Sequence, residues 1–295
     1  MSSMVIFIST AHHLKDRYWS LIKSRQTLML TLTGVAGYLC ARAGPVDWLR
    51  FAGMLGSLLV TIGGCTVLNM VFDRDIDQKM ARTRQRPLAA KQIEVRTAAW
   101  LGSGLILLGL VWSLALSRLY FALAVAGVGL DLLVYTIWLK RRSAWSILWG
   151  GLSGGIPILA SRALVIGRVD LTGLLLAFAI VCWIPSHNLT LNMLYSDDFL
   201  NAGIPTFLNV YGLTTTRAAV AFSSLFSVIL MGAAFVQLGL SLPVVAVLAV
   251  SSLGLVGLAV YVWARSSRQA VGILYKYSSF YMLAAMLLLL LAVLL

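Results

Sequence analysis

The sequence NMVFDRDIDQKMARTRQRP, residues 69–87, carries three aspartates and five basic residues directly after a long apolar run. Asn69, Asp73 and Asp77 are spaced four residues apart in it. If the helix of the apolar run continues through them, their side chains lie on one face over about two turns. An amide and two carboxylates so placed suit a hard cation such as Mg2+, which keeps several waters and binds substrate phosphates. Asp75 points to the opposite side of this helix, and we predict that it does not bind the cation.

A simpler alternative is that this stretch is a solvated cytoplasmic loop, because charge clusters commonly follow membrane segments. That alternative accounts for the arginines. It does not account for the helical spacing of Asn69, Asp73 and Asp77 back toward the membrane, where ionisable groups are costly and tend to be functional. The sequence therefore favours a cation site, and the basic residues that follow would attract a diphosphate.

The composition identifies the class of protein. Of the 295 residues, 60% are apolar and 11% are charged, whereas a soluble domain has roughly 25% charged residues. We therefore expect an all-α, polytopic membrane bundle that forms a single domain over residues 1–295. Apolar runs near the length of a spanning helix predict nine transmembrane helices, at about 22–41, 49–72, 97–117, 119–139, 144–166, 171–194, 218–239, 242–264 and 276–295.

The basic residues are distributed unevenly between the predicted loops. If the N-terminus lies in the cytoplasm, most of the 23 Lys and Arg residues fall in inner segments, as the positive-inside rule requires. The net charge of +13 is then explained by the bilayer, and nucleic acid is excluded as a partner. Localisation in the cell membrane with a cytoplasmic N-terminus is the corresponding prediction.

A second acidic segment follows the sixth predicted span. Residues 195–217 are expected to form an inner loop, like residues 73–96, and contain Asp197 and Asp198. Carboxylates from the two segments would face each other across the bundle and hold two or more Mg2+ ions, which clamp a diphosphate as it leaves. Asp73, Asp77 and Asp198 are the predicted catalytic residues, and Arg82, Arg86 and Lys140 are candidate counter-charges.

Three polar residues lie within predicted spans. Asp131 is followed one turn later by Tyr135. A functional carboxylate and a hydrogen-bonded structural one remain equally open for Asp131. His187 is the only histidine in a predicted span. A structural histidine is the commoner explanation, and a ligand, acid or base is the alternative.

Four segments resemble those of the UbiA superfamily of intramembrane prenyltransferases. NMVFDRDIDQKMARTRQRPL is similar to its first motif, NxxxDxxxD followed by MxRTxxRPL. IKSR at 22–25 is similar to its KPR, YTIWLKRRSAWSILWGGLSGGIP at 135–157 to its fourth-to-fifth span signature, and WIPSHNLTLNMLYSDDFLNAGIP at 183–205 to its W-x-P-P-H-F…Y-K-D-D-Y-x-x-A-G-x-P segment. Together they cover roughly residues 20–215.

This resemblance implies nine helices around a central cavity that opens sideways to lipid. It also implies that two Asp-rich motifs bind Mg2+ and a prenyl diphosphate at the cytoplasmic face. The residues that match the metal motifs are Asn69, Asp73, Asp77, Asp197 and Asp198, and those expected to bind the diphosphate are Arg82, Arg86, Lys140, Lys23 and Arg25.

His187 matches a histidine typical of the haem-modifying branch of the superfamily. The resemblance to that branch implies transfer of a farnesyl group from farnesyl diphosphate to a vinyl group of haem b. Haem is then a substrate, His187 contacts it, Mg2+ is the cofactor, and a haem A synthase acting downstream is a candidate partner. The chain departs from the family pattern at Ser24, Ser186, Asn188, Ser196, Phe199 and Thr206, mostly near the second motif, which leaves the acceptor open.

Three alternatives remain. Another prenyltransferase of the superfamily, acting on a quinone precursor or a lipid glycerol, would use the same diphosphate residues. A transporter would be expected to show repeated halves and broken helices at the midplane, and the sequence shows no such repeat. A structural subunit would have no use for paired aspartate clusters.

Overall fold

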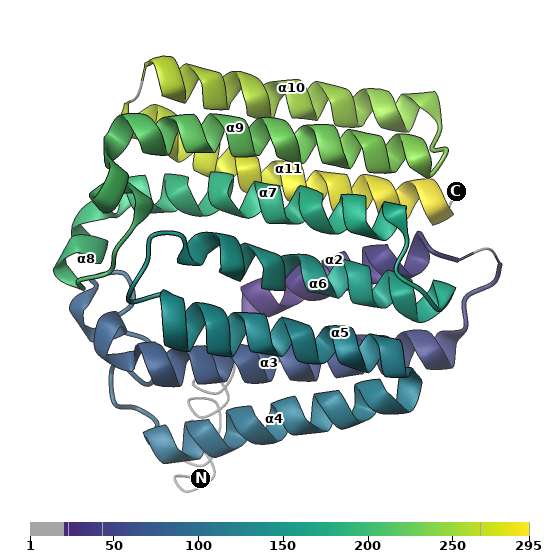
Figure 1. Ribbon diagram of the computed structural model, residues 1–295, viewed down its shortest axis with the longest axis horizontal. Coiled ribbons are helices and arrows are strands. Elements are labelled where there is room, and N and C mark those ends of the chain that lie inside the picture. Colours follow the sequence, from purple (N-terminus) through teal and green to yellow (C-terminus); the bar gives the residue numbers. More distant parts are fainter. Residues whose placement is uncertain (1–20, 23, 43, 266, 295) are drawn as a thin grey trace, which may run out of the picture.

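The computed structural model describes residues 21–22, 24–42, 44–265 and 267–294, and the regular elements in these ranges are all helices (Figure 1). The elements are α2 (Ser24–Leu39), α3 (Trp48–Lys79), α4 (Val95–Leu116), α5 (Arg118–Val128), the π-helix η1 (Gly129–Leu139), α6 (Ser146–Ile166), α7 (Leu171–Leu194), α8 (Ser196–Asn201), α9 (Phe207–Gln237), α10 (Leu242–Ala264) and α11 (Arg268–Leu294).

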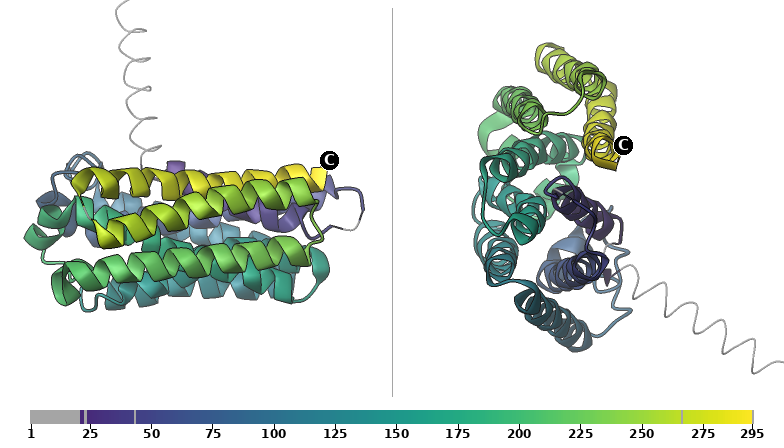
Figure 2. Two further views of the ribbon diagram at one scale, coloured as in Figure 1. Left: turned by 90° about the horizontal axis from the view of Figure 1, so that it is seen from above. Right: turned by 90° about the vertical axis from the view of Figure 1, so that its right-hand side faces the viewer.

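The long helices run nearly parallel and form one bundle (Figures 1 and 2). Within the described ranges, eight helices are long and apolar enough to cross a membrane, with α5 and η1 together forming one of them. The ninth predicted span, 22–41, corresponds to α2, which has 16 residues. The prediction of an all-α membrane bundle is therefore confirmed.

The outward surface of the bundle is apolar. Trp100 on α4 is 70% exposed and Leu253 on α10 is 74% exposed. Many small polar side chains are buried instead, among them Ser57, Ser186 and Ser224. An apolar exterior around a partly polar interior is the arrangement that lipid requires.

Small residues allow α2, α6 and α7 to pack closely. A Cβ on Gly37 of α2 would lie 2.2 Å from the carbonyl oxygen of Ile158 on α6. A Cβ on Gly155 of α6 would lie 2.8 Å from the carbonyl oxygen of Ala177 on α7. Backbones this close exclude any larger residue at either glycine. These contacts fix the positions of three helices that line the central cavity.

The structure bears on two predicted inner segments. Helix α3 continues past the apolar span that ends at residue 72 to Lys79, as the predicted shared face of Asn69, Asp73 and Asp77 requires, and the carboxylates of Asp73 and Asp77 are paired inside the protein. The prediction that 195–217 is a loop is wrong for most of its length. It forms α8 and the start of α9, where the Thr206 hydroxyl accepts a capping hydrogen bond from the Asn209 N–H at 3.2 Å.

Candidate active site

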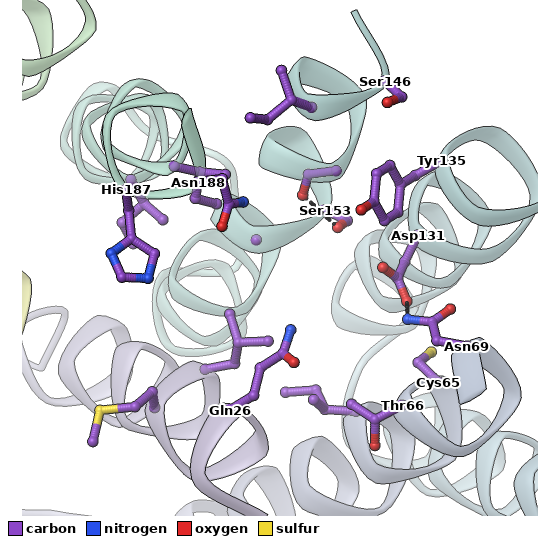
Figure 3. A pocket seen from close by; sticks show the side chains of 18 of the residues that line it. Gln26, Cys65, Thr66, Asn69, Asp131, Tyr135, Ser146, Ser153, His187 and Asn188 are labelled. Carbon is purple, nitrogen blue, oxygen red and sulfur yellow. Dashed lines mark hydrogen bonds between the residues drawn. The ribbon is translucent and has the colours of Figure 1, made fainter. Parts of the chain in front are cut away.

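A cavity of about 870 Å³ runs through the middle of the bundle. Side chains of α2, α3, α5, η1, α6, α7 and α11 line it. Figure 3 shows part of this lining, with Asn69 on α3, Asp131 and Tyr135 on η1, and His187 on α7. The volume is at the upper end of the range for pockets that bind organic ligands, roughly 300–1,000 Å³.

Asp73 faces the cavity and is 3% exposed. Its Oδ2 accepts a hydrogen bond from the Lys140 ammonium, which comes from the end of η1. Its Oδ1 is buried and has no hydrogen-bond partner within the described part of the chain. A buried carboxylate oxygen without a partner is costly, so this atom is a candidate ligand for a cation.

Asp77 lies one turn further along α3. Both of its oxygens accept from Nη1 of Arg86 at 2.9 Å, and the side chain is 6% exposed. Asp75, between the two, is 54% exposed and is paired with Arg141. The prediction that Asp75 points away from the other two aspartates is confirmed.

Asn69 is held by two residues of η1. Its Nδ2 donates to Oδ2 of Asp131 at 3.0 Å, and its Oδ1 accepts from the Thr136 hydroxyl at 2.8 Å. In this arrangement the amide nitrogen faces Asp131 and the amide oxygen faces Thr136. Asn69, Asp73 and Asp77 therefore lie on one buried face of α3, as the spacing predicts.

The second acidic segment reaches the same end of the bundle. The Asp198 carboxylate accepts hydrogen bonds from the backbone N–H groups of Ala81 at 3.1 Å and Arg82 at 3.3 Å. Asp197 is exposed and accepts from the Ser196 hydroxyl at 3.3 Å. Neither aspartate lines the cavity, and among the described residues no group of three or more His, Cys, Asp or Glu is arranged to hold a metal ion. Their metal-binding role stays a prediction.

The predicted diphosphate ligands fall into two groups. Arg82, Arg86 and Lys140 all line the cavity. Partial burial and the neighbouring Arg86 lower the pKa of Arg82. Burial also lowers the pKa of Lys140, but Tyr135 and Asp73 outweigh it, so the net pKa is raised and the ammonium stays charged. Lys23 and the side chain of Arg25 lie outside the described residues.

His187 lies in the cavity wall between two aromatic rings. Trp183 stacks on one side with ring centroids 4.9 Å apart, and Tyr275 of α11 stacks on the other at 4.6 Å. Nδ1 of His187 is 3.0 Å from the Ser278 hydroxyl, which itself donates to the Tyr275 carbonyl oxygen at 2.9 Å. In this network Nδ1 carries the proton and donates it to Ser278, and Nε2 keeps its lone pair.

Sequence reasoning missed the residues that hold Asn69 and His187 in place. Thr136 is 67 positions from Asn69, and Ser278 is 91 positions from His187. Neither has a sequence signature of its own. Thr136 and Asp131 also lie on the same side of their helix because it is a π-helix, whereas the sequence pattern predicts an α-helix there.

The fold and this cavity define a membrane-embedded protein with an interior site that is charged at one end and largely apolar elsewhere. The UbiA prenyltransferase family matches residues 28–283 of this chain. The chain belongs to this family and is a prenyltransferase, which confirms the prediction made from the motifs.

Relatives and solved structures agree with this assignment. A protoheme IX farnesyltransferase of Pyrobaculum neutrophilum is 34% identical over 274 residues, which cover 89% of this chain and 94% of the relative. A structure of digeranylgeranylglyceryl phosphate synthase has a TM-score of 0.79 at 18% identity, covering 94% of this chain and 98% of that one. A UbiA homologue from Archaeoglobus fulgidus bound to GPP and Mg2+ has a TM-score of 0.68 at 14% identity, covering 92% and 99%. At these identities the two structures establish the fold.

Proposed function

We propose that this chain transfers the farnesyl group of farnesyl diphosphate to a vinyl group of haem b, giving haem O and pyrophosphate. One observation carries this proposal. A single cavity contains a charged end, at Asp73, Asp77, Arg86 and Lys140, and a histidine held between aromatic rings, at His187. The similarity to a protoheme IX farnesyltransferase supports the same acceptor.

The residues at the charged end fit a divalent cation. Asp73 offers a buried oxygen without a hydrogen-bond partner in the described ranges, and the amide oxygen of Asn69 has a second lone pair beside its bond to Thr136. Asn69, Asp73 and Asp77 would hold Mg2+, with Asp197 and Asp198 as the proposed second set. Bound Mg2+ supplies positive charge that stabilises the departing pyrophosphate. The homologue with GPP and Mg2+ supports this cofactor.

Basic side chains assist at the same end of the cavity. Lys140 and Arg86 neutralise Asp73 and Asp77 in the structure. When a diphosphate binds beside the carboxylates, these cations and Arg82 contact its oxygens. Lys23, which precedes α2 in the sequence, and Arg25 remain proposed contributors.

The two ends of the cavity have different roles in the proposed reaction. Loss of pyrophosphate leaves an allylic cation, which the apolar and aromatic walls shield from water. The vinyl carbon forms a bond to C1 of the farnesyl group. Water adds a hydroxyl to the cation that results on the vinyl group and releases a proton. His187 orients the haem or binds its iron through Nε2, which the hydrogen bond at Nδ1 leaves unprotonated.

The proposed location is the cell membrane, with the charged end of the cavity on the cytoplasmic side. The chain is a multi-pass membrane protein. The loops that carry most of the basic residues lie at the same end as α8, on the left in Figure 1. By the positive-inside rule, this end of the bundle faces the cytoplasm. The N-terminus and the charged end of the cavity are then also on the cytoplasmic side of the cell membrane.

A comparison of acceptors tests this function. Membranes that contain the chain are incubated with farnesyl diphosphate, Mg2+ and either haem b, a quinone precursor or a lipid glycerol. We expect a prenylated product in the incubation with haem b and in neither of the other two. A product from the quinone precursor or the lipid, with haem b unchanged, would assign the other acceptor class. In cells, loss of the chain should remove haem O and any haem A made from it by a downstream haem A synthase.

A further inference from the structure

The second half of the fourth spanning helix is a π-helix. Residues Gly129–Leu139 form η1, and its winding continues to Lys140, whose backbone N–H donates to the carbonyl oxygen of Tyr135, five positions earlier, at 2.8 Å. Runs of π-helix are rare and often mark functional sites. Here the run borders the charged end of the cavity.

The winding determines which side chains of η1 face α3. Nine positions separate Asp131 from Lys140, and at about 100° per residue an α-helix would place the two on opposite sides. A π-helix joins residues five apart and has about 4.4 residues per turn, so the same nine positions complete about two turns. Both side chains accordingly contact α3, where Asp131 bonds Asn69 and Lys140 bonds Asp73.

The two sides of η1 differ in exposure. Thr136, which lies between Asp131 and Lys140, is 2% exposed, and its single hydroxyl proton has two acceptors within reach, Asn69 Oδ1 at 2.8 Å and the Asp131 carbonyl oxygen at 2.7 Å. Leu133 and Trp138 are 63% and 53% exposed on the opposite face. The π-helix therefore has a polar face toward α3 and an exposed apolar face on the other side.

We propose that Asp131 and Thr136 are positioning residues, which the π-helix turns toward α3 so that they fix the amide of Asn69 with its oxygen directed to the cation. This inference rests on the proposed function and extends it to residues that do not touch the substrate. Asp131 accepts a hydrogen bond from the amide nitrogen, and the Thr136 hydroxyl donates to one lone pair of the amide oxygen. The other lone pair of that oxygen would then serve the cation, next to Asp73 on the buried side of α3. Mutation of a residue that hydrogen-bonds to a metal ligand commonly lowers metal affinity by about 10–100-fold.

Paired variants of the full-length chain in detergent test the proposal. Thr136→Val keeps the shape of the side chain and removes the hydroxyl, whereas Thr136→Ser keeps the hydroxyl. Asp131→Leu removes the acceptor, whereas Asp131→Asn retains an oxygen for the Asn69 amide. Mn2+ binding, followed by electron paramagnetic resonance, should weaken about tenfold or more in Thr136→Val and Asp131→Leu. Thr136→Ser and Asp131→Asn should bind Mn2+ as the wild type does, at an unchanged melting temperature.

Wild-type Mn2+ affinity in Thr136→Val, or a wild type that binds no Mn2+, would overturn the proposal. Mn2+ binding is measured without an acceptor. A negative result for the positioning role is therefore independent of whether haem b is the acceptor. Haem O formation with undisturbed Mn2+ binding in Thr136→Val would contradict only the positioning role.

Discussion

Asp198 accepts a hydrogen bond from the backbone N–H of Ala81 at 3.1 Å, across 117 positions of sequence. This bond joins the segment after α7 to the turn that follows α3, and it brings both acidic motifs to one end of the bundle. The carboxylate oxygens that were predicted to bind a cation are used here to hold the backbone at the cavity mouth.

The first prediction concerns this bond. In Asp198→Ala, the amide hydrogens of Ala81 and Arg82 lose a charged acceptor, and a bond of this kind is worth about 1.5 kcal/mol or more. Their hydrogen exchange should therefore accelerate by about tenfold, and transfer activity should fall as the segment loosens. Asp198→Asn, which keeps one acceptor oxygen, should show a smaller increase. Unchanged exchange in Asp198→Ala would show that the bond does not hold this turn.

The second prediction compares two aspartates on the same helix. Asp73→Asn removes a buried charge that faces the cavity, and the rate of transfer should fall by about 100-fold or more. Asp75→Asn removes an exposed charge that is paired with Arg141 away from the cavity, and the rate should stay near that of the wild type. Steady-state assays with farnesyl diphosphate measure both. Equal losses in the two variants would contradict the assignment of Asp73.

The third prediction concerns the packing of α2 on α6. Gly37→Ala places a methyl group 2.2 Å from the Ile158 carbonyl oxygen, so the helices must separate, at a cost of about 1–3 kcal/mol. Gly104→Ala is the matched control, because a Cβ there meets no atom within 4 Å. Thermal unfolding in detergent should show a lower midpoint for Gly37→Ala and an equal or higher one for Gly104→Ala. A Gly37→Ala protein as stable as the wild type would contradict the close approach.

The fourth prediction concerns an ion pair at the end of the bundle opposite to the charged end. Nε and Nη2 of Arg162 donate to the Asp170 oxygens at 2.8 and 2.7 Å. These bonds lower the pKa of Asp170 more than its burial raises it. Because the folded-state pKa lies below the ordinary value of 3.8, the pair stabilises the fold above that pH. The stabilisation is lost as the pH falls through the folded-state pKa.

Asp170→Asn tests this dependence. At pH 7 the variant should be less stable by about 3 kcal/mol, because Arg162 remains buried without its charged partner. The difference in melting temperature between variant and wild type should shrink as the pH is lowered below 4. A difference that does not change with pH would mean that the charge of Asp170 contributes nothing to stability.

The sequence predicts the helical class and the buried face of α3 because both depend on local periodicity. Nine apolar runs specify the helices, and the spacing of Asn69, Asp73 and Asp77 places them together. Partner choice is not local. Lys140 and Arg86 were predicted as counter-charges for a diphosphate, and the structure pairs them with Asp73 and Asp77. Asp198 bonds to backbone groups, which leave no trace in side-chain patterns, and the alignment of Asp131 with Lys140 depends on a π-helix.

The product that the purified chain forms from farnesyl diphosphate and haem b decides whether haem is the acceptor. Liquid chromatography with mass spectrometry, run with and without Mg2+, identifies that product. We expect haem b that carries one farnesyl group and one hydroxyl, formed only with Mg2+ and absent in Asp73→Asn. Unmodified haem b under conditions in which farnesyl diphosphate is consumed would contradict it.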